Sequence, residues 1–588
     1  MDSCKKNYKC FLESDRFKLI GIAGVGIGIG YAYLKQAKSI KLRSDEPKFL
    51  KTLQEGNEEQ VTKALLQIIE KIKKSKEKQE VPFHDNFKTK SFSLLMNLFG
   101  SENKHTSSLA ALVLSKFLND GVYCNKLETL EGIEKLISKI KELTLLLNEE
   151  PNQEYLINYL KLLFKIIKIG QKKSVLRIVQ NDGIATLGSL LHNEDLNDEC
   201  LVLILKNLTW CCEFYKTIPL MLEKQDILMV VKPLLESSNE KIVEYSSSLI
   251  NDYSENTELC QKLDQAGIVK ELTQLILSSK NDEILCNTSL SLTKLMADRQ
   301  ISDLICIEYE IVPYIIDKLL RSKNKNLNYC GCQFIEIAAK ASVSNKVLIR
   351  ECGAFPVLIS LLDKNNEDDD DKKDDENKNK ENNNQKNKNQ KLLQQTISTI
   401  KELTVQSTRT NNVKYLRELN ILPKIISCFK DCKSEKMQLN LVIIIGNFSC
   451  STATARIELM KSGVLTNLTK LLLSTNDVNL TRNLVCTYAN LLISAEVHKE
   501  LYNNGGIEAM LKSLESTDQQ TQYGALIGLR NIFLNMNEDL QFYEKLHEYL
   551  LSLNILPRLA RLAEQNTGNM KLFIQGILKI LAPNVGMI

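Results

Sequence analysis

A sequence phrase that recurs about every 43 residues limits most strongly what this chain can fold into. Each copy opens with a small or polar residue, continues as an apolar helical pattern of about ten residues, and leads through a polar turn into a second, longer apolar helix. Successive copies are separated by 43, 41, 43, 43, 67, 43, 43 and 48 residues. The copies begin at Gly183, Asp226, Gly267, Glu310, Gly353, Asn420, Gly463, Gly506 and Asn554. Such a period predicts stacked all-α units that bury one continuous core.

The single long interval contains residues 364–391, which are only Lys, Asp, Glu, Asn and Gln. Nothing in this segment can be buried in a core, so we predict a disordered insertion that interrupts one repeat. Repeats are therefore expected over residues 101–363 and again over 392–588. A further, less regular copy begins at Gly132, and residues 35–100 are interpreted as a basic linker with helices.

The period excludes tetratricopeptide and ankyrin repeats, which are close to 34 and 33 residues, and fits armadillo or HEAT repeats. The Gly-Ile, Gly-Val or Gly-Ala opening, together with an Asn in the last helix, resembles armadillo repeats. This resemblance implies an armadillo-type right-handed α-solenoid whose last helices line a concave groove.

In armadillo proteins an Asn on the last helix grips the backbone of an extended peptide, and the resemblance carries this role to matching positions. A carboxamide can both donate to and accept from a peptide group. The expected groove residues are Asn207, Trp210, Asn251, Asn447, Asn490 and Asn531. The middle repeats depart from this pattern, with Lys294, Glu336 and Glu402 in place of Asn. The alternative is that each Asn joins neighbouring repeats from within.

The amino-terminal region contains an uncharged segment at residues 19–34, flanked on both sides by basic residues. We predict a transmembrane signal-anchor there, after a tail at 1–18, with the carboxyl-terminal domain in the cytosol. The segment resembles the signal anchors of mitochondrial outer-membrane proteins, while peroxisomal and endoplasmic-reticulum membranes stay open. Small-residue pairs suggest self-association through Gly24, Gly26, Gly28 and Gly30. The alternatives are a buried glycine-rich helix and a secretory signal.

Composition argues against several classes of function. A net charge of only +4 disfavours nucleic-acid binding, and five His offer little material for a histidine-based site. The 16 Cys form no C-x-x-C pair, and no phosphate-binding glycine loop is present. We therefore expect no enzymatic activity, no catalytic residues, no cofactor and no metal.

These observations predict a non-enzymatic, membrane-tethered armadillo scaffold that binds a protein partner, as an extended peptide or a helix, in its groove. Its layout resembles animal armadillo proteins anchored on the mitochondrial outer membrane. One alternative is a soluble armadillo adaptor or transport receptor of the importin α or β-catenin kind. Another is an enzyme or ligase adaptor with a small module within residues 45–130.

Overall fold

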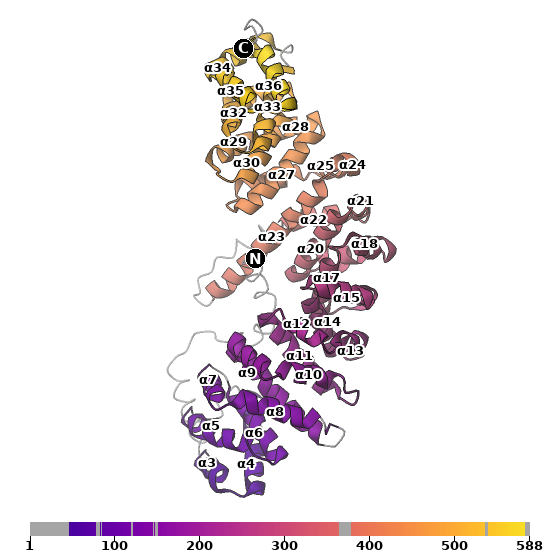
Figure 1. Ribbon diagram of the computed structural model, residues 1–588, viewed down its shortest axis with the longest axis vertical. Coiled ribbons are helices and arrows are strands. Elements are labelled where there is room, and N and C mark those ends of the chain that lie inside the picture. The colour runs from indigo at the N-terminus through magenta and orange to yellow at the C-terminus, as the bar shows by residue number, and fades with distance from the viewer. Residues whose placement is uncertain are drawn as a thin grey trace. The chain divides into compact units, whose positions relative to one another are not determined.

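The computed structural model describes residues 46–77, 83, 85–118, 121–144, 146–147, 151–363, 378–534 and 539–582. All regular secondary structure in these residues is helical. The chain divides into two compact units, Met1–Leu295 (unit 1) and Met296–Ile588 (unit 2). Figure 1 shows the helices following one another in chain order within each unit.

Unit 1 consists of helices with the following bounds. They are α3 (Glu46–Glu55), α4 (Glu58–Glu77), α5 (Asp85–Phe99), α6 (Lys104–Phe117), α7 (Gly121–Thr129), α8 (Gly132–Thr144), α9 (Asn152–Gln180), α10 (Gly183–Leu191), α11 (Asp198–Phe214), α12 (Ile218–Glu223), α13 (Ile227–Leu234), α14 (Glu240–Tyr253), α15 (Thr257–Gln265), α16 (Ile268–Ser278) and α17 (Asp282–Leu295).

Unit 2 begins with the short α18 (Arg299–Asp303) and contains two π-helical segments, η3 and η4. Its elements are α18, η3 (Leu304–Glu308), α19 (Val312–Tyr314), η4 (Ile315–Leu320), α20 (Lys325–Ala341), α21 (Val343–Glu351), α22 (Ala354–Asp363), α23 (Lys378–Thr404), α24 (Ser407–Thr410), α25 (Asn412–Glu418), α26 (Leu422–Lys430), α27 (Glu435–Ser451), α28 (Ala453–Lys461), α29 (Val464–Ser474), α30 (Val478–Leu491), α31 (Ala495–Asn503), α32 (Gly506–Lys512), η6 (Ser513–Glu515), α33 (Gln519–Leu534), α34 (Leu540–Ser552), α35 (Ile555–Gln565) and α36 (Gly568–Leu581).

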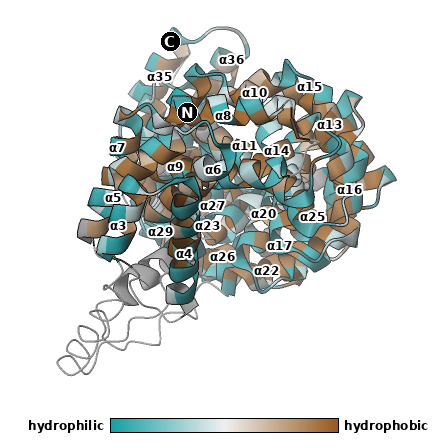
Figure 2. Ribbon diagram, turned by 90° about the horizontal axis from the view of Figure 1, so that it is seen from below, coloured by the Kyte–Doolittle hydropathy of each residue, from teal (hydrophilic) through white to brown (hydrophobic). Residues whose placement is uncertain are grey.

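Each regular repeat has three helices, a short first helix, a second helix and a third helix, as in α15, α16 and α17. The first helix adds to the two that the sequence pattern indicated. In α9 a single residue with non-helical backbone angles, Gln171, separates the third helix of one repeat from the first helix of the next. Figure 2 shows hydrophobic and hydrophilic residues together along the helices, as expected where one side of each helix packs into the core.

The recurring sequence phrase has a backbone cause. A residue with left-handed backbone angles joins the first helix to the second, and glycine, asparagine and aspartate tolerate this conformation better than other residues. In two repeats this residue comes one position before the predicted opening, at Asp182 and Gly505. The left-handed residues are Asp182, Asp226, Gly267, Glu310, Gly353, Asn420, Gly463, Gly505 and Asn554, with φ between 50° and 80°. The same geometry at Glu131 supports the repeat predicted from Gly132.

Gly463→Ala tests this explanation, because φ is 72° at this position while a Cβ would have no atom within 4 Å. We expect a loss of about 1 kcal/mol in the free energy of unfolding from backbone strain alone. Gly576→Ala, inside α36 and equally open, is the matched control. That change should instead stabilise the chain by about 0.5 kcal/mol. Urea denaturation followed by circular dichroism measures both, and a shift of the same sign for the two variants would contradict the explanation.

The amino-terminal described residues form packed helices where the sequence suggested a linker. Helices α3 to α6 contact one another, and α6 packs on α9. Four rings fill the space between them, with Phe83 at 4.7 Å from Phe87, 6.3 Å from Phe49 and 6.1 Å from Phe117, measured between ring centroids. The packed core of unit 1 therefore includes residues that the predicted boundary at residue 101 left out.

The predicted insertion at 364–391 also differs in part from the structure. Helix α23 begins at Lys378, so the second half of the polar segment is helical. The buried Leu392, Ile397 and Ile400 anchor the helix, which extends toward its amino terminus into the polar residues. Near this end the Lys325 ammonium donates to Asn389 Oδ1 at 2.8 Å. Residues 364–377 lie outside the described residues.

The predicted single-pass membrane location, with the mitochondrial outer membrane preferred, is corrected by the structure. Among the described residues, no helix combines the length and the apolar composition needed to cross a membrane. The 20-residue α4 and the 29-residue α9 are long enough, but both carry many charged side chains. The segment at 19–34, with the glycines proposed for self-association, lies outside the described residues.

Candidate protein-binding surface

The third helices of successive repeats contact one another and form a row in each unit. The row of unit 1 contains α4, α6, α9, α11, α14 and α17, and that of unit 2 contains α20, α23, α27, α30, α33 and α36. We call these the third-helix rows. All the predicted groove residues lie on them, so the structure places these residues on equivalent helices as the sequence predicted.

The amide groups of four predicted Asn residues join neighbouring repeats. Nδ2 of Asn207 donates to Leu160 O at 3.2 Å, and Nδ2 of Asn531 donates to Ala489 O at 2.8 Å. Asn490 donates to Gly446 O at 3.4 Å, and Asn447 donates to Thr404 Oγ1 at 2.9 Å. Each bond reaches the third helix of the preceding repeat. This contact is the alternative role that the sequence left open, and peptide binding by the same side chains stays a prediction.

Burial differs among these side chains. Asn207 is fully buried and Asn531 is 8% exposed, whereas Asn447 and Asn490 are half-buried. The Oδ1 atom of Asn207 is inaccessible and has no hydrogen-bond partner among the described residues. Of the four, Asn447 and Asn490 are therefore the ones with surface to offer a bound peptide.

Lys294 occupies an Asn position on α17 and makes the equivalent contact with a longer side chain. Its Nζ donates to Asn251 Oδ1 at 2.9 Å and to Asn251 O at 3.2 Å, and it forms an ion pair with Glu255. Burial lowers the pKa of the Lys294 ammonium, although Glu255 opposes this effect. Asn251 is thus an acceptor in a contact between repeats, and the departure from Asn at 294 preserves the connection.

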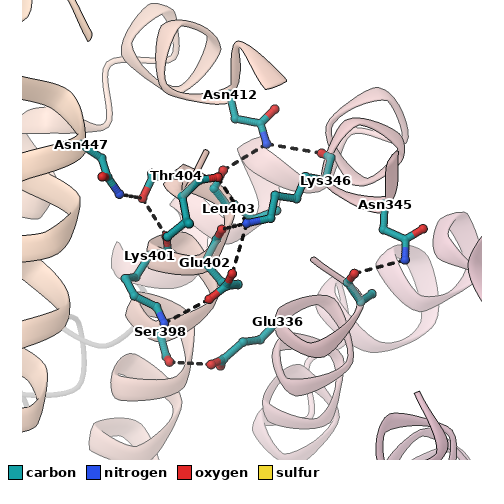
Figure 3. Close-up of polar contacts among 12 residues, drawn as sticks. Glu336, Asn345, Lys346, Ser398, Lys401, Glu402, Leu403, Thr404, Asn412 and Asn447 are labelled. Atoms are coloured by element: carbon teal, nitrogen blue, oxygen red, sulfur yellow. Dashed lines mark hydrogen bonds and ion pairs between the residues drawn. The ribbon is translucent and has the colours of Figure 1, made fainter. Parts of the chain in front are cut away.

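The two acidic departures from the Asn pattern hold α23 in place (Figure 3). On one side of this helix, Glu336 accepts hydrogen bonds from Gln395 Nε2 at 2.5 Å and Ser398 Oγ at 2.8 Å. On the other side, Lys346 of α21 donates to Glu402 Oε1 at 3.1 Å and to the carbonyl oxygens of Glu402 and Val405 at 2.7 and 3.2 Å.

The ion pair between Lys346 and Glu402 is buried, with side-chain exposures of 4% and 13%. Burial lowers the pKa of Lys346. Burial alone would raise the pKa of Glu402, but Lys346 and Lys401 outweigh it, so this pKa is lowered. Both groups therefore stay charged at neutral pH and satisfy each other. These residues stabilise the fold and offer no open ligand site.

Trp210 belongs to a line of rings and ammonium groups that crosses three consecutive third helices. Its ring lies at 5.3 Å from the Phe164 ring, edge to face. Lys206 Nζ lies at 4.4 Å from the Phe164 centroid and at 5.6 Å from that of Tyr245. Lys168 lies over Trp210 at 5.8 Å, and Lys172 over Tyr215 at 5.7 Å. We call this set the aromatic–lysine stripe, which consists of Phe164, Lys168, Lys172, Lys206, Trp210, Tyr215 and Tyr245.

Sequence reasoning found only Trp210 of this stripe. Every member is half-buried except Lys172, which is exposed, so the stripe reaches the surface of unit 1. Rings at corresponding places on consecutive third helices were the available signal, because repeats of known period bring such positions together.

The thiols and imidazoles show no sign of a reactive or metal-binding arrangement. Within the described residues, no group of three or more His, Cys, Asp or Glu side chains is placed to hold a metal. Burial raises the pKa of Cys200 and of Cys332 to about 12, so both stay as thiols. His498 is buried between Tyr543 Oη at 2.7 Å and Leu492 O at 2.8 Å. Burial lowers the pKa of His498, which indicates a neutral structural imidazole.

Comparisons with known proteins identify the fold but no family. No protein-family model matches the chain, and no curated protein matches it. The crystal structure of an engineered protein, Northeast Structural Genomics Consortium target OR497, aligns with a TM-score of 0.61 at 17% identity, covering 75% of this chain and 98% of that chain. A designed armadillo repeat protein aligns with a TM-score of 0.37 at 18% identity, covering 45% of this chain and 99% of that one. Together with its three-helix repeats of about 43 residues, the first of these similarities shows that the chain has an armadillo-like α-solenoid fold.

Proposed function

We propose that this chain is a non-enzymatic scaffold that binds extended segments of partner proteins along its third-helix rows. The observation that carries the proposal is the aromatic–lysine stripe, which brings half-buried rings from α9, α11 and α14 to one surface. Large rings surrounded by packed neighbours are typical of binding hot spots, since they bury much apolar area at little entropic cost. Stacked repeats favour extended ligands because they repeat one surface along a line.

Selection of peptides from a random library on the purified full-length chain tests this function, with affinities measured by calorimetry. We expect Trp210→Ala to weaken a selected peptide at least about tenfold, because the ring lies in the centre of the stripe. The control is Met229→Ala on the second helix α13, a side chain that is 63% exposed and far from the stripe in sequence. It should leave the affinity unchanged. The proposal fails if no peptide is selected, or if Trp210→Ala folds normally and binds every selected peptide as the unchanged chain does.

A further inference from the structure

The stripe lysines differ from their neighbours on the third helices of unit 1 in what they contact. Lys161 is paired with Glu199 at 2.7 Å, and Lys294 is paired with Glu255. By contrast, Lys168 and Lys172 contact ring faces, and no carboxylate of the described residues lies within ion-pair distance of either. The structure therefore places positive charge on this surface without neutralising it locally.

Ring contacts hold these ammonium groups in position before any ligand arrives. Each cation over a ring face is attracted to the ring by about 0.5–1 kcal/mol at an exposed site. A lysine held in this way loses less side-chain entropy on binding than one that is free in solvent. Lys206 lies over two rings, Phe164 and Tyr245, which belong to the helices on either side of its own. The contacts thus fix a line of cations across α9 and α11.

We propose that unit 1 selects acidic extended segments, whose carboxylates bind Lys168, Lys172 and Lys206 while their apolar side chains pack against Trp210 and Tyr245. This inference rests on the proposed function and names the chemistry of the partner. A carboxylate is the complementary acceptor for an ammonium group, and the charge-assisted hydrogen bond is stronger than a neutral one. A basic segment would be repelled by the same three lysines.

Single-stranded nucleic acid also carries negative charge, but the stripe suits it less well. Proteins that bind single strands stack successive bases on open aromatic faces. Here lysines of the chain already cover faces of Phe164, Trp210, Tyr215 and Tyr245. The net charge of +4 is also small for a nucleic-acid binder.

The sole tryptophan of the chain lies in the stripe, so intrinsic fluorescence of the full-length protein reports on this surface. Three peptides with the same apolar positions are titrated, with Glu and Asp, Gln and Asn, or Lys and Arg at the other positions. We expect the acidic peptide to change the Trp210 emission at the lowest concentration, and its affinity to fall as salt is added.

Variants are compared by calorimetry, because a substitution beside Trp210 alters its emission directly. Lys168→Gln with Lys206→Gln should weaken the acidic peptide at least about tenfold, whereas Lys168→Arg with Lys206→Arg should retain most of the affinity. Lys270→Gln, an exposed lysine on the second helix α16, is the control that should change nothing. Equal weakening by the Gln and Arg pairs would overturn the assignment of charge as the cause.

The remaining outcomes separate this inference from the function on which it rests. If the neutral or basic peptide binds best and still changes the Trp210 emission, selection of acidic segments is wrong and the scaffold function stands. If no peptide, including those selected from the library, changes the emission, both proposals fail. If oligo-uridine binds more tightly than the acidic peptide at the same salt concentration, the inference is overturned in favour of nucleic acid.

Discussion

Lys346→Met is expected to lower the free energy of unfolding by about 3–5 kcal/mol, one of the two largest effects anticipated for a single substitution in this chain. The substitution removes the partner of the buried Glu402 carboxylate and leaves the Glu402 and Val405 carbonyl oxygens without their donor. Exposures of 4% and 13% mean that water does not replace the lost contacts. Chemical denaturation followed by circular dichroism measures the change.

Lys512→Met supplies the matched control, since Lys512 forms an ion pair with Glu508 at exposures of 57% and 41%. Exposed pairs of this kind contribute less than about 1 kcal/mol. Adding Glu402→Gln to Lys346→Met should recover part of the loss, because a neutral amide is less costly to bury than an unpaired carboxylate. A loss below about 1 kcal/mol for Lys346→Met would show that the pair does not hold α21 against α23.

Phe83→Ala is expected to cost about 3–5 kcal/mol, because it empties the centre of the aromatic cluster between α3, α5 and α6. The ring is 1% exposed and contacts those of Phe49, Phe87 and Phe117. Hydrogen exchange should accelerate in α3 to α6 before it does in the later repeats, since stacked repeats can open locally.

Leu66→Ala on α4 is the control in the same layer, at 48% exposure. A substitution this exposed should change the free energy of unfolding by no more than about 0.5 kcal/mol. If Phe83→Ala has no larger effect than Leu66→Ala, residues 46–118 behave as the linker that the sequence suggested, and the packed layer is wrong.

The phase of the repeats could be predicted from sequence because a backbone requirement leaves a direct trace in residue type. Left-handed φ at the junction of first and second helices favours Gly, Asn and Asp, and these residues mark most openings. Glu310 obeys the same geometry without the favoured residue type, and its repeat was found only from the apolar pattern around it. The amino-terminal helices lack such regular openings, so their packing was missed.

The candidate site could be predicted only in part. Helical periodicity placed the Asn residues on equivalent third helices, but it does not say which neighbour an amide reaches. The partners of Asn207 and Asn531 lie 47 and 42 residues earlier, on helices whose relative rotation depends on packing. For the same reason Phe164, Lys206 and Tyr245 showed no link to Trp210 in sequence, although they lie together in the structure.

The central claim is that a third-helix row is the surface that binds partners, and hydrogen–deuterium exchange with a bound peptide tests it most directly. The full-length chain is compared with and without a peptide selected from the library, at a saturating concentration. The account predicts slower exchange in α9, α11 and α14 and no change in the second helices α10, α13 and α16. Protection confined to α10, α13 and α16, with the third helices unchanged, would contradict it.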